Sequence, residues 1–339
     1  MSTPQFFQTT FEAVRETTSQ VKQGKAREIG RSAGGRSLFA ITYGEKEPIT
    51  RTANLSSALA GGKPQAFFGE KPRKRQVFMV TAGVHGAEME GIAAVLNLLS
   101  LMENGKDLGG REWPGILEAA EKLRIVVVPC LNPDGRARIP LDDPTTWTPE
   151  EVEKYRHGLD KEGRPIRWPQ CKLVHPRDLE EDSFLGGYFN DAGVNPLHGV
   201  FLPPDIAPET HAALALALDE TPDCVLDLHS CSAPIPFFIV GDVSLPESYC
   251  RRQHSLEGFC RRLLSERVGI DYNVAWPGCE GALTLESAYY HICGALPMTF
   301  EGIYRPEHGP SWPHERIVDS YLGIFEGLMT AGSKEGFKP

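Results

Sequence analysis

The residues best suited to chemistry in this sequence are His85 and Glu88, an imidazole and a carboxylate three positions apart. Ahead of them, Val77 to Val80 has the apolar, bounded pattern of a buried strand, and after them Ile92 to Leu99 has helical periodicity. The pair therefore lies where a strand ends and a helix begins, which is where open α/β sheets place their ligands. Because neutral imidazole and carboxylate both suit zinc, the pair is interpreted as half of a metal site.

Two later strands also end in residues that a hydrolytic metal site uses. The predicted buried strand over residues 224–229 ends at His229, and the predicted strand over 296–301 ends at Glu301. His229 completes a set of two histidines and one carboxylate, which leaves a fourth tetrahedral position for water, as in catalytic zinc sites. Glu301 is the candidate for a second carboxylate, outside the coordination shell, that takes a proton from this water.

The elements that must position these residues follow a strand, helix, strand order. Leu123 to Pro129 is a β-branched, apolar run typical of a strand in the middle of a sheet. This order predicts a right-handed crossover and a parallel pair of strands. Glu28 to Tyr43 predicts a hairpin that turns at Gly34 and Gly35. Further helices are predicted over residues 11–25, 207–220, 256–268, 283–292 and 313–329, a further strand over 237–240, and a loop over 53–74.

Residues from about 139 to 208 have little periodicity and are rich in proline, tryptophan and charge. This stretch is longer than an ordinary connection, which is typical of a lid, a substrate-binding insertion or a flexible segment. Its many aromatic residues favour an ordered insertion near the active site. Because the sequence has no internal repeat and no clear linker, residues 1–339 are predicted to form a single domain.

Composition excludes some classes of protein. The net charge of −10 and a single short basic run, Lys71 to Arg75, argue against nucleic-acid binding. No apolar run approaches the length of a membrane span, and the first ten residues do not resemble a secretory signal, so a cytoplasmic location without membrane contact is expected. The eight cysteines have no Cys-x-x-Cys spacing, which favours reduced thiols.

Four motifs then stand in the order known from one family of metallopeptidases: His85-Gly-Ala-Glu88, Asn132-Pro-Asp-Gly135, Asp227-Leu-His-Ser230 and Phe300-Glu301. In these motifs the chain resembles the zinc carboxypeptidase family, and residues 29–38 resemble its opening hairpin. The resemblance spans about residues 28–305. It implies a mixed, mostly parallel, twisted sheet of eight strands with helices on both faces, one Zn²⁺, and hydrolysis of an amide bond.

The resemblance also implies roles for the site residues. His85, Glu88 and His229 would hold the zinc, which polarises the scissile carbonyl and lowers the pKa of its bound water to about 7. Glu301 would be the catalytic base that accepts the proton of this water and passes it to the leaving nitrogen.

The segment Gly193-Val-Asn-Pro-Leu-His198 departs from the family pattern. Leu197 and His198 stand where the family has the Asn-Arg pair that grips a terminal carboxylate. Asn195 stands where an aspartate would orient a zinc histidine. His198 and Asn195 are therefore candidates for substrate binding.

Other cations are candidates for the missing carboxylate clamp. Arg136 and Arg138 follow the Asn-Pro-Asp-Gly turn at the strand-end face, and Arg138 is the preferred candidate, against the ordinary alternative of an ion-paired arginine. Glu286 is a candidate for binding a basic group of the substrate. The alternative is that its carboxylate lies on the surface of a helix and has no role in binding. Cys231 is expected to be a small thiol that lines the site.

Three functions remain open at this stage. The leading hypothesis is zinc-dependent, metallocarboxypeptidase-like hydrolysis of a small peptide or a modified amino acid. Its nearest rival is an N-acyl amino acid deacylase of the aspartoacylase or succinylglutamate desuccinylase kind, which the missing clamp favours. The third is a binding or regulatory module without catalysis, and the four intact residues His85, Glu88, His229 and Glu301 argue against it.

Overall fold

A mixed β-sheet forms the centre of the molecule in the computed structural model, which describes residues 3–167, 169–173, 175–231, 233, 235–242, 244–270, 276–277, 283–304 and 311–339. The strand order is β1-β2-β4-β3-β7-β10-β8-β9. The central strands β4, β3, β7 and β10 run parallel, whereas β1, β2 and β8 pair antiparallel with their inner neighbours. The bounds are β1 (Lys25–Arg31), β2 (Ser37–Tyr43), β3 (Gln76–Ala82), β4 (Leu123–Val128), β7 (Cys224–Cys231), β8 (Phe237–Val240), β9 (Trp276–Pro277) and β10 (Leu296–Ile303).

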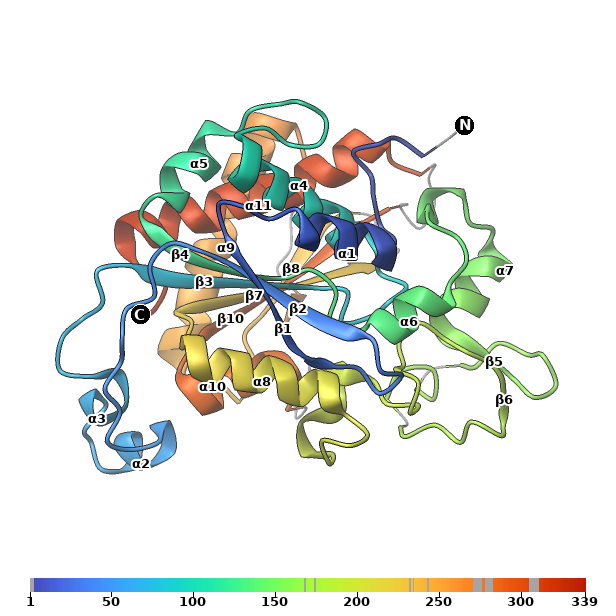
Figure 1. Cartoon of the computed structure of the whole chain (residues 1–339), viewed down its shortest axis with the longest axis horizontal. Helices are drawn as coiled ribbons and strands as arrows, with labels where there is room; N and C mark the ends of the chain where they lie inside the picture. Colours follow the sequence, from blue (N-terminus) through green and yellow to red (C-terminus); the bar gives the residue numbers. More distant parts are fainter. Residues whose placement is uncertain are drawn as a thin grey trace.

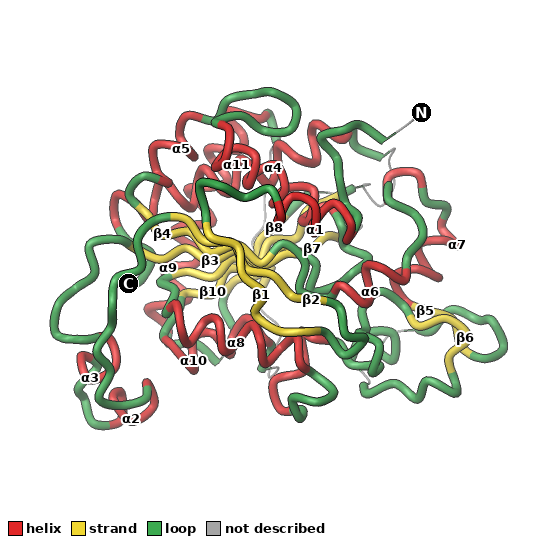
Figure 2. The backbone as a smooth tube through the Cα atoms, viewed as in Figure 1, coloured by secondary structure: helices red, strands yellow, loops and turns green. Residues whose placement is uncertain are grey.

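Helices cover both faces of this sheet, so the predicted fold class is confirmed (Figures 1 and 2). The eighth strand, β9, has only two residues, which leaves seven strands of ordinary length. Each face has its own apolar core. One core includes residues of α1 (Phe11–Ser19), α4 (Glu90–Asn104), α5 (Pro114–Ala120), α9 (Glu247–Val268) and α11 (His314–Glu335), and the other includes residues of α2 (Leu55–Ala60), α3 (Gln65–Phe68), α8 (Pro208–Glu220) and α10 (Leu285–Cys293).

Strand β3 and helix α4 provide the rigid frame on either side of the His85 turn. Residues Val77 to Ala82 of β3 are buried because the strand lies between β4 and β7 with helices on both faces. Helix α4 is apolar on nearly all sides, as expected of a helix packed between a sheet and a further helix, here α11. It ends at Gly105, whose φ of 74° is the left-handed conformation that glycine adopts without strain.

The Asn-Pro-Asp-Gly motif connects the end of β4 to the opening hairpin. Asn132 caps the short helix α6 (Pro133–Arg138), because its side chain accepts from the N–H of Gly135 at 2.9 Å. Asp134 is buried and accepts from the Ser32 hydroxyl at 2.5 Å and from the Gly34 N–H at 2.7 Å. The motif is therefore a helix start and not only the predicted turn, and it binds the tip of the β1–β2 hairpin to the strand-end side of the sheet.

The other sequence predictions differ from the structure mainly at element ends. The predicted loop over residues 53–74 is wrong, since α2 and α3 form there and Asn54 caps α2 by accepting from the N–H of Ser57 at 2.8 Å. Helix α5 has no counterpart among the predictions, because its seven residues are too few for periodicity to be visible. In the described part of the chain, no helix has both the length and the apolar character to cross a membrane.

Residues 139–208 form short, irregular elements beside the strand ends, at the right of Figure 1. They include a two-stranded antiparallel sheet and several single turns. The insertion is ordered around Trp147, which is 1% exposed, while Trp168 lies outside the described residues. The single domain over 1–339 stays a prediction. The elements are η1 (Pro144–Thr146), α7 (Pro149–Val152), η2 (Glu153–His157), β5 (Gly158–Asp160), β6 (Asp182–Leu185) and η3 (Pro196–Phe201).

Candidate metal centre

Three ligand atoms converge at the carboxyl ends of β3 and β7. The Nδ1 atom of His85 lies 3.0 Å from Oε1 of Glu88. The Nδ1 atom of His229 lies 3.0 Å from Oε2 of Glu88 and 3.2 Å from Nδ1 of His85. All three side chains are buried. The structure therefore brings together the three residues predicted to bind the metal.

In the turn that carries His85 and Glu88, Gly86 packs directly against the backbone of Gly135 and Arg136. A Cβ atom at this position would lie 2.1 Å from the backbone nitrogen of Arg136, so no other residue fits without moving α6. The N–H of Gly86 donates to the carbonyl oxygen of Gly187 at 2.8 Å. The turn is thus held between the Asn-Pro-Asp-Gly helix and the insertion, which fixes the direction of both ligands.

The protonation of His229 fits a metal on its Nδ1 side. Its Nε2 atom faces two carboxylates, Asp227 at 3.2 Å and Glu286 at 3.3 Å, which can accept a hydrogen bond from a proton on this nitrogen. With a proton on Nε2, Nδ1 is the nitrogen that would bind a metal. Burial lowers the pKa of His85 to about 3, so this imidazole is neutral as well.

Burial opposes a charge on His229, but Asp227, Glu286 and Glu88 raise its pKa well above the ordinary value, so this cluster of two imidazoles and a carboxylate favours a positive charge. The donor set of two nitrogens and one carboxylate suits zinc. The group that the sequence implies therefore fits the residues present.

Asp227 and Glu286 support His229 from the side opposite to the metal. Asp227 is itself held by a hydrogen bond from the hydroxyl of Thr81. Asp227, His229 and Glu286 also lie close enough together to bind an ion, but they meet at the nitrogen that carries the proton. We interpret them as the carboxylate support that metal-binding histidines commonly have. This explains the position of Glu286, which sequence analysis left open between pocket and surface.

Glu301 lies beside the metal ligands, on the neighbouring strand. In the parallel register of β10 and β7 it stands opposite His229. Its side chain is half-buried, and its Oε2 atom has no hydrogen-bond partner among the described residues. Burial raises the pKa of Glu301 above its ordinary value, and the charge of Glu88 acts in the same direction. A carboxylate of raised basicity with a free oxygen is suited to accept a proton.

The insertion contributes three residues that sequence reasoning missed. Tyr188 meets the ring of His85 edge-on, with centroids 4.7 Å apart. Lys172 places its Nζ atom 5.1 Å from the centre of the Tyr188 ring. Arg156 donates to the carbonyl oxygen of Ser230 at 2.9 Å and to its hydroxyl at 3.1 Å. Only the density of aromatic residues signalled this segment, because irregular structure leaves no periodic pattern.

Arg136 and Arg138, the predicted cations for substrate binding, are engaged elsewhere. Arg136 is 2% exposed and donates to the carbonyl oxygens of Thr9 and Ile139 at 2.8 Å and 3.1 Å. Arg138 donates to three backbone carbonyl oxygens between residues 185 and 189 and to the carboxylate of Asp191. These contacts favour a structural role for both guanidinium groups over the predicted contact with substrate.

We therefore expect Arg138→Ala to lower the free energy of unfolding by about 2–3 kcal/mol and to leave KM within about twofold. The reason is that three carbonyl oxygens of the insertion lose a charged donor, whereas no substrate contact is lost. Denaturant unfolding and steady-state kinetics measure the two effects. Arg164→Ala is the matched control, since Arg164 is an exposed arginine of the insertion paired with Asp160. A large rise in KM at unchanged stability would restore the substrate role of Arg138.

His198 and Asn195 both lie in the insertion, near Lys172. His198 is half-buried on η3, and burial lowers its pKa to about 4. Asn195 is buried, accepts from the N–H of Leu197 at 3.1 Å and donates to the carbonyl oxygen of Lys172 at 3.1 Å. Asn195 therefore does not orient a zinc histidine, and the buried Nε2 atom of His85 has no hydrogen-bond partner among the described residues.

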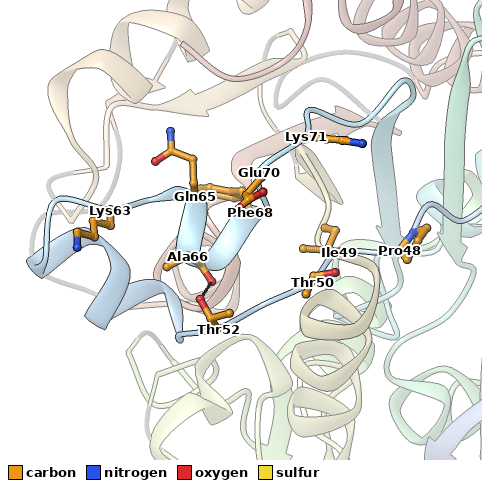
Figure 3. A pocket seen from close by; sticks show the side chains of 11 residues that line it. Pro48, Ile49, Thr50, Thr52, Lys63, Gln65, Ala66, Phe68, Glu70 and Lys71 are labelled. Carbon is orange, nitrogen blue, oxygen red and sulfur yellow. Dashed lines mark hydrogen bonds between the residues drawn. The ribbon is translucent and has the colours of Figure 1, made fainter.

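A separate pocket of about 680 Å³ lies away from this centre, where the irregular segment 48–52 passes α3 (Figure 3). Ile49 and Phe68 supply apolar surface, and Lys63, Glu70 and Lys71 supply charge. None of the metal ligands, and neither Glu301 nor Lys172, lines it. The chemistry predicted from the sequence therefore belongs to the strand-end centre and not to this pocket.

Comparisons with known proteins agree with the fold. The model of the zinc carboxypeptidase family matches residues 13–172. A metallo-carboxypeptidase from Burkholderia cenocepacia has 16% identity and a TM-score of 0.60 over 93% of this chain and 66% of its own. One from Pseudomonas aeruginosa, in complex with (2-guanidinoethylmercapto)succinic acid, has 16% identity and a TM-score of 0.55 over 94% and 67%. Carboxypeptidase A from Helicoverpa armigera has 12% identity and a TM-score of 0.56 over 97% and 74%.

These matches confirm the resemblance to the zinc carboxypeptidase family and its fold. The family match includes His85 and Glu88, whereas His229 and Glu301 lie beyond its end. At such identities the solved structures show the fold alone, and the chain spans just under two thirds of the Burkholderia cenocepacia chain. No curated protein sequence matches the chain.

Proposed function

We propose that this protein is a zinc-dependent hydrolase that cleaves an amide bond of a peptide or an acylated amino acid. The observation that carries the proposal is the meeting of the His85 and His229 Nδ1 atoms with the Glu88 carboxylate, next to the free oxygen of Glu301. A zinc ion bound there supplies Lewis acidity, which polarises a carbonyl group and acidifies a water molecule.

The residues of the chain have distinct parts in this reaction. Glu301 takes up the proton of the attacking water and returns it to the leaving nitrogen, for which its raised pKa is suited. Asp227 and Glu286 hold His229 in the tautomer whose Nδ1 is free to bind the metal. Arg156 fixes Ser230, and the N–H of Ser230 donates to Glu88 at 3.3 Å, which orients that carboxylate.

Metal analysis of the purified protein, followed by assays before and after chelation, tests the proposal. We expect about one zinc per chain, loss of amide hydrolysis on removal of the metal, and recovery when zinc is added back. The assay uses a panel of N-blocked dipeptides, N-acyl amino acids and γ-linked amides. A protein without zinc, or hydrolysis that survives chelation, would contradict the proposal. A protein with zinc that turns over none of the panel would favour the binding or regulatory module.

The panel also separates the leading function from its rival, an N-acyl amino acid deacylase. The segment 193–198 favours the rival, because Leu197 is buried in the core and His198, not an arginine, faces the site region. Two features favour the peptidase, because they match the motifs of that family: the β1–β2 hairpin and the Asn-Pro-Asp-Gly helix. Asp134 joins them by hydrogen bonds. Faster turnover of N-acetyl or N-succinyl amino acids than of dipeptides would select the deacylase.

A further inference from the structure

Lys172 lies near the site but has no role in the reaction proposed above. Its side chain is half-buried and its Nζ atom lies over the face of Tyr188, whose edge meets His85. One aromatic ring therefore separates the ammonium group from a metal ligand. Among the described residues, no carboxylate lies within ion-pair distance of this ammonium, although its charge acts on Glu88, Glu286 and Glu301.

The position of Lys172 is fixed by its main chain. Its N–H donates to the carbonyl oxygen of Pro169 at 3.2 Å, and its own carbonyl oxygen accepts from the buried amide of Asn195 at 3.1 Å. The two hydrogen bonds hold the backbone of Lys172, and the ring contact places its ammonium group over Tyr188, which leaves the hydrogen-bond donors of this group available.

The group remains charged at this depth. Burial opposes the charge of Lys172, but the surrounding Tyr188, Glu88, Glu301 and Glu286 keep its pKa above the ordinary value. Lys172 and the residues whose charges act on it, His198, Glu286 and Glu301, are all half-buried, so solvent reaches part of each side chain. An accessible cation without an ion-pair partner suits an anionic group of a ligand.

We propose that the Lys172 ammonium binds the free carboxylate of the substrate, in peptides or acylated amino acids whose carboxylate stands next to the amide that is cleaved. This specificity rests on the proposed hydrolase function. In this proposal a lysine of the insertion binds the carboxylate, and not Arg136 or Arg138, because the donors of these two arginines are engaged with the backbone. A single ammonium matches one singly charged carboxylate, and both peptidase and deacylase substrates carry such a group.

The test measures binding, so that it does not depend on turnover. N-acetyl-L-phenylalanine and its carboxamide differ only in the carboxylate, and isothermal titration calorimetry gives the Kd of each for the zinc-loaded full chain. We expect the wild type to bind the acid at least about 10-fold more tightly than the amide. Lys172→Met should abolish this preference while leaving the Kd of the amide unchanged, and Lys172→Arg should retain most of it.

Lys154→Met is the matched control, because Lys154 also belongs to the insertion and places its Nζ atom 5.4 Å and 5.2 Å from the rings of Tyr155 and Phe184. This variant should keep the wild-type preference. Lys172→Gln replaces Lys172→Met if the latter does not fold, as judged by circular dichroism. Equal affinity of the wild type for acid and amide, or an unchanged preference in the Lys172 variants, would overturn the proposal.

The same proteins show whether the two proposals fail separately. Hydrolysis with a lost preference for free carboxylates in Lys172→Met supports both. Hydrolysis with an unchanged preference overturns only the role of Lys172. Tight, Lys172-dependent binding of the acid without any amide hydrolysis overturns only the hydrolase function.

Discussion

Replacing Glu301 with glutamine is expected to lower kcat by about 10²–10⁴-fold and to leave the zinc content at the wild-type level. Glutamine has nearly the same shape but cannot accept the proton, and Glu301 is not among the three residues whose ligand atoms converge. Its Oε2 atom has no partner among the described residues, so the substitution breaks no hydrogen bond there. Steady-state kinetics and metal analysis of the same preparation measure the two quantities.

A buried glutamate far from the metal centre controls for the change of charge. Glu326 lies on α11 and pairs with Arg267 at 2.6 Å. Glu326→Gln should reduce stability and leave kcat within about twofold of wild type. If Glu301→Gln kept the full rate, the assignment of the catalytic base would be wrong. If it lost zinc as well, Glu301 would be a metal ligand instead.

The second large effect is expected for His85→Ala, which should lose zinc and activity together. Loss of a partner outside the coordination shell typically weakens metal binding by about 10–100-fold, so loss of a ligand atom should weaken it by more than about 100-fold. Two of the three converging atoms would remain, at 3.0 Å from each other in His229 and Glu88. Competition with a zinc-binding dye gives the Kd of the metal directly.

His198→Ala is the matched control for this variant. His198 is half-buried near the same centre, but its side chain is not part of the group of ligand atoms that meet. We expect it to bind zinc as the wild type does and to affect KM alone. Wild-type zinc affinity in His85→Ala would refute the metal centre, whereas zinc loss in His198→Ala would require a different ligand set.

The agreement between sequence and structure is closest where residues follow a regular element. His85, His229 and Glu301 each stand at the end of a strand whose apolar run is visible in the sequence, and parallel strands bring their carboxyl ends to one edge. The spacing of His85 and Glu88 places both on one turn, so local geometry brings them together. Strand ends and the spacing of two nearby residues are local features, so they can be predicted from the sequence alone.

The substrate side of the site could not be predicted in this way. Arg138 follows a motif and was therefore the preferred cation, but its donors point to backbone carbonyls between residues 185 and 189, more than 40 positions along the chain. Lys172 has no motif at all. It faces the site because Asn195 and Tyr188 hold it there, and contacts of this kind arise only when irregular segments pack against one another.

Periodicity and strand order are local features of the sequence, and they predicted the parallel strand pair and the strand ends that carry the candidate metal ligands and the candidate base. The full sheet with helices on both faces followed only from the resemblance to the family. Only the tertiary structure places Asp227 and Glu286 at Nε2 of His229 and distinguishes among the cations. The physical reason is that a cation is available to a substrate only if its donors are not already bonded, and this depends on side chains far apart in the chain. For the same reason we propose Lys172, and not Arg138, as the cation that binds the substrate.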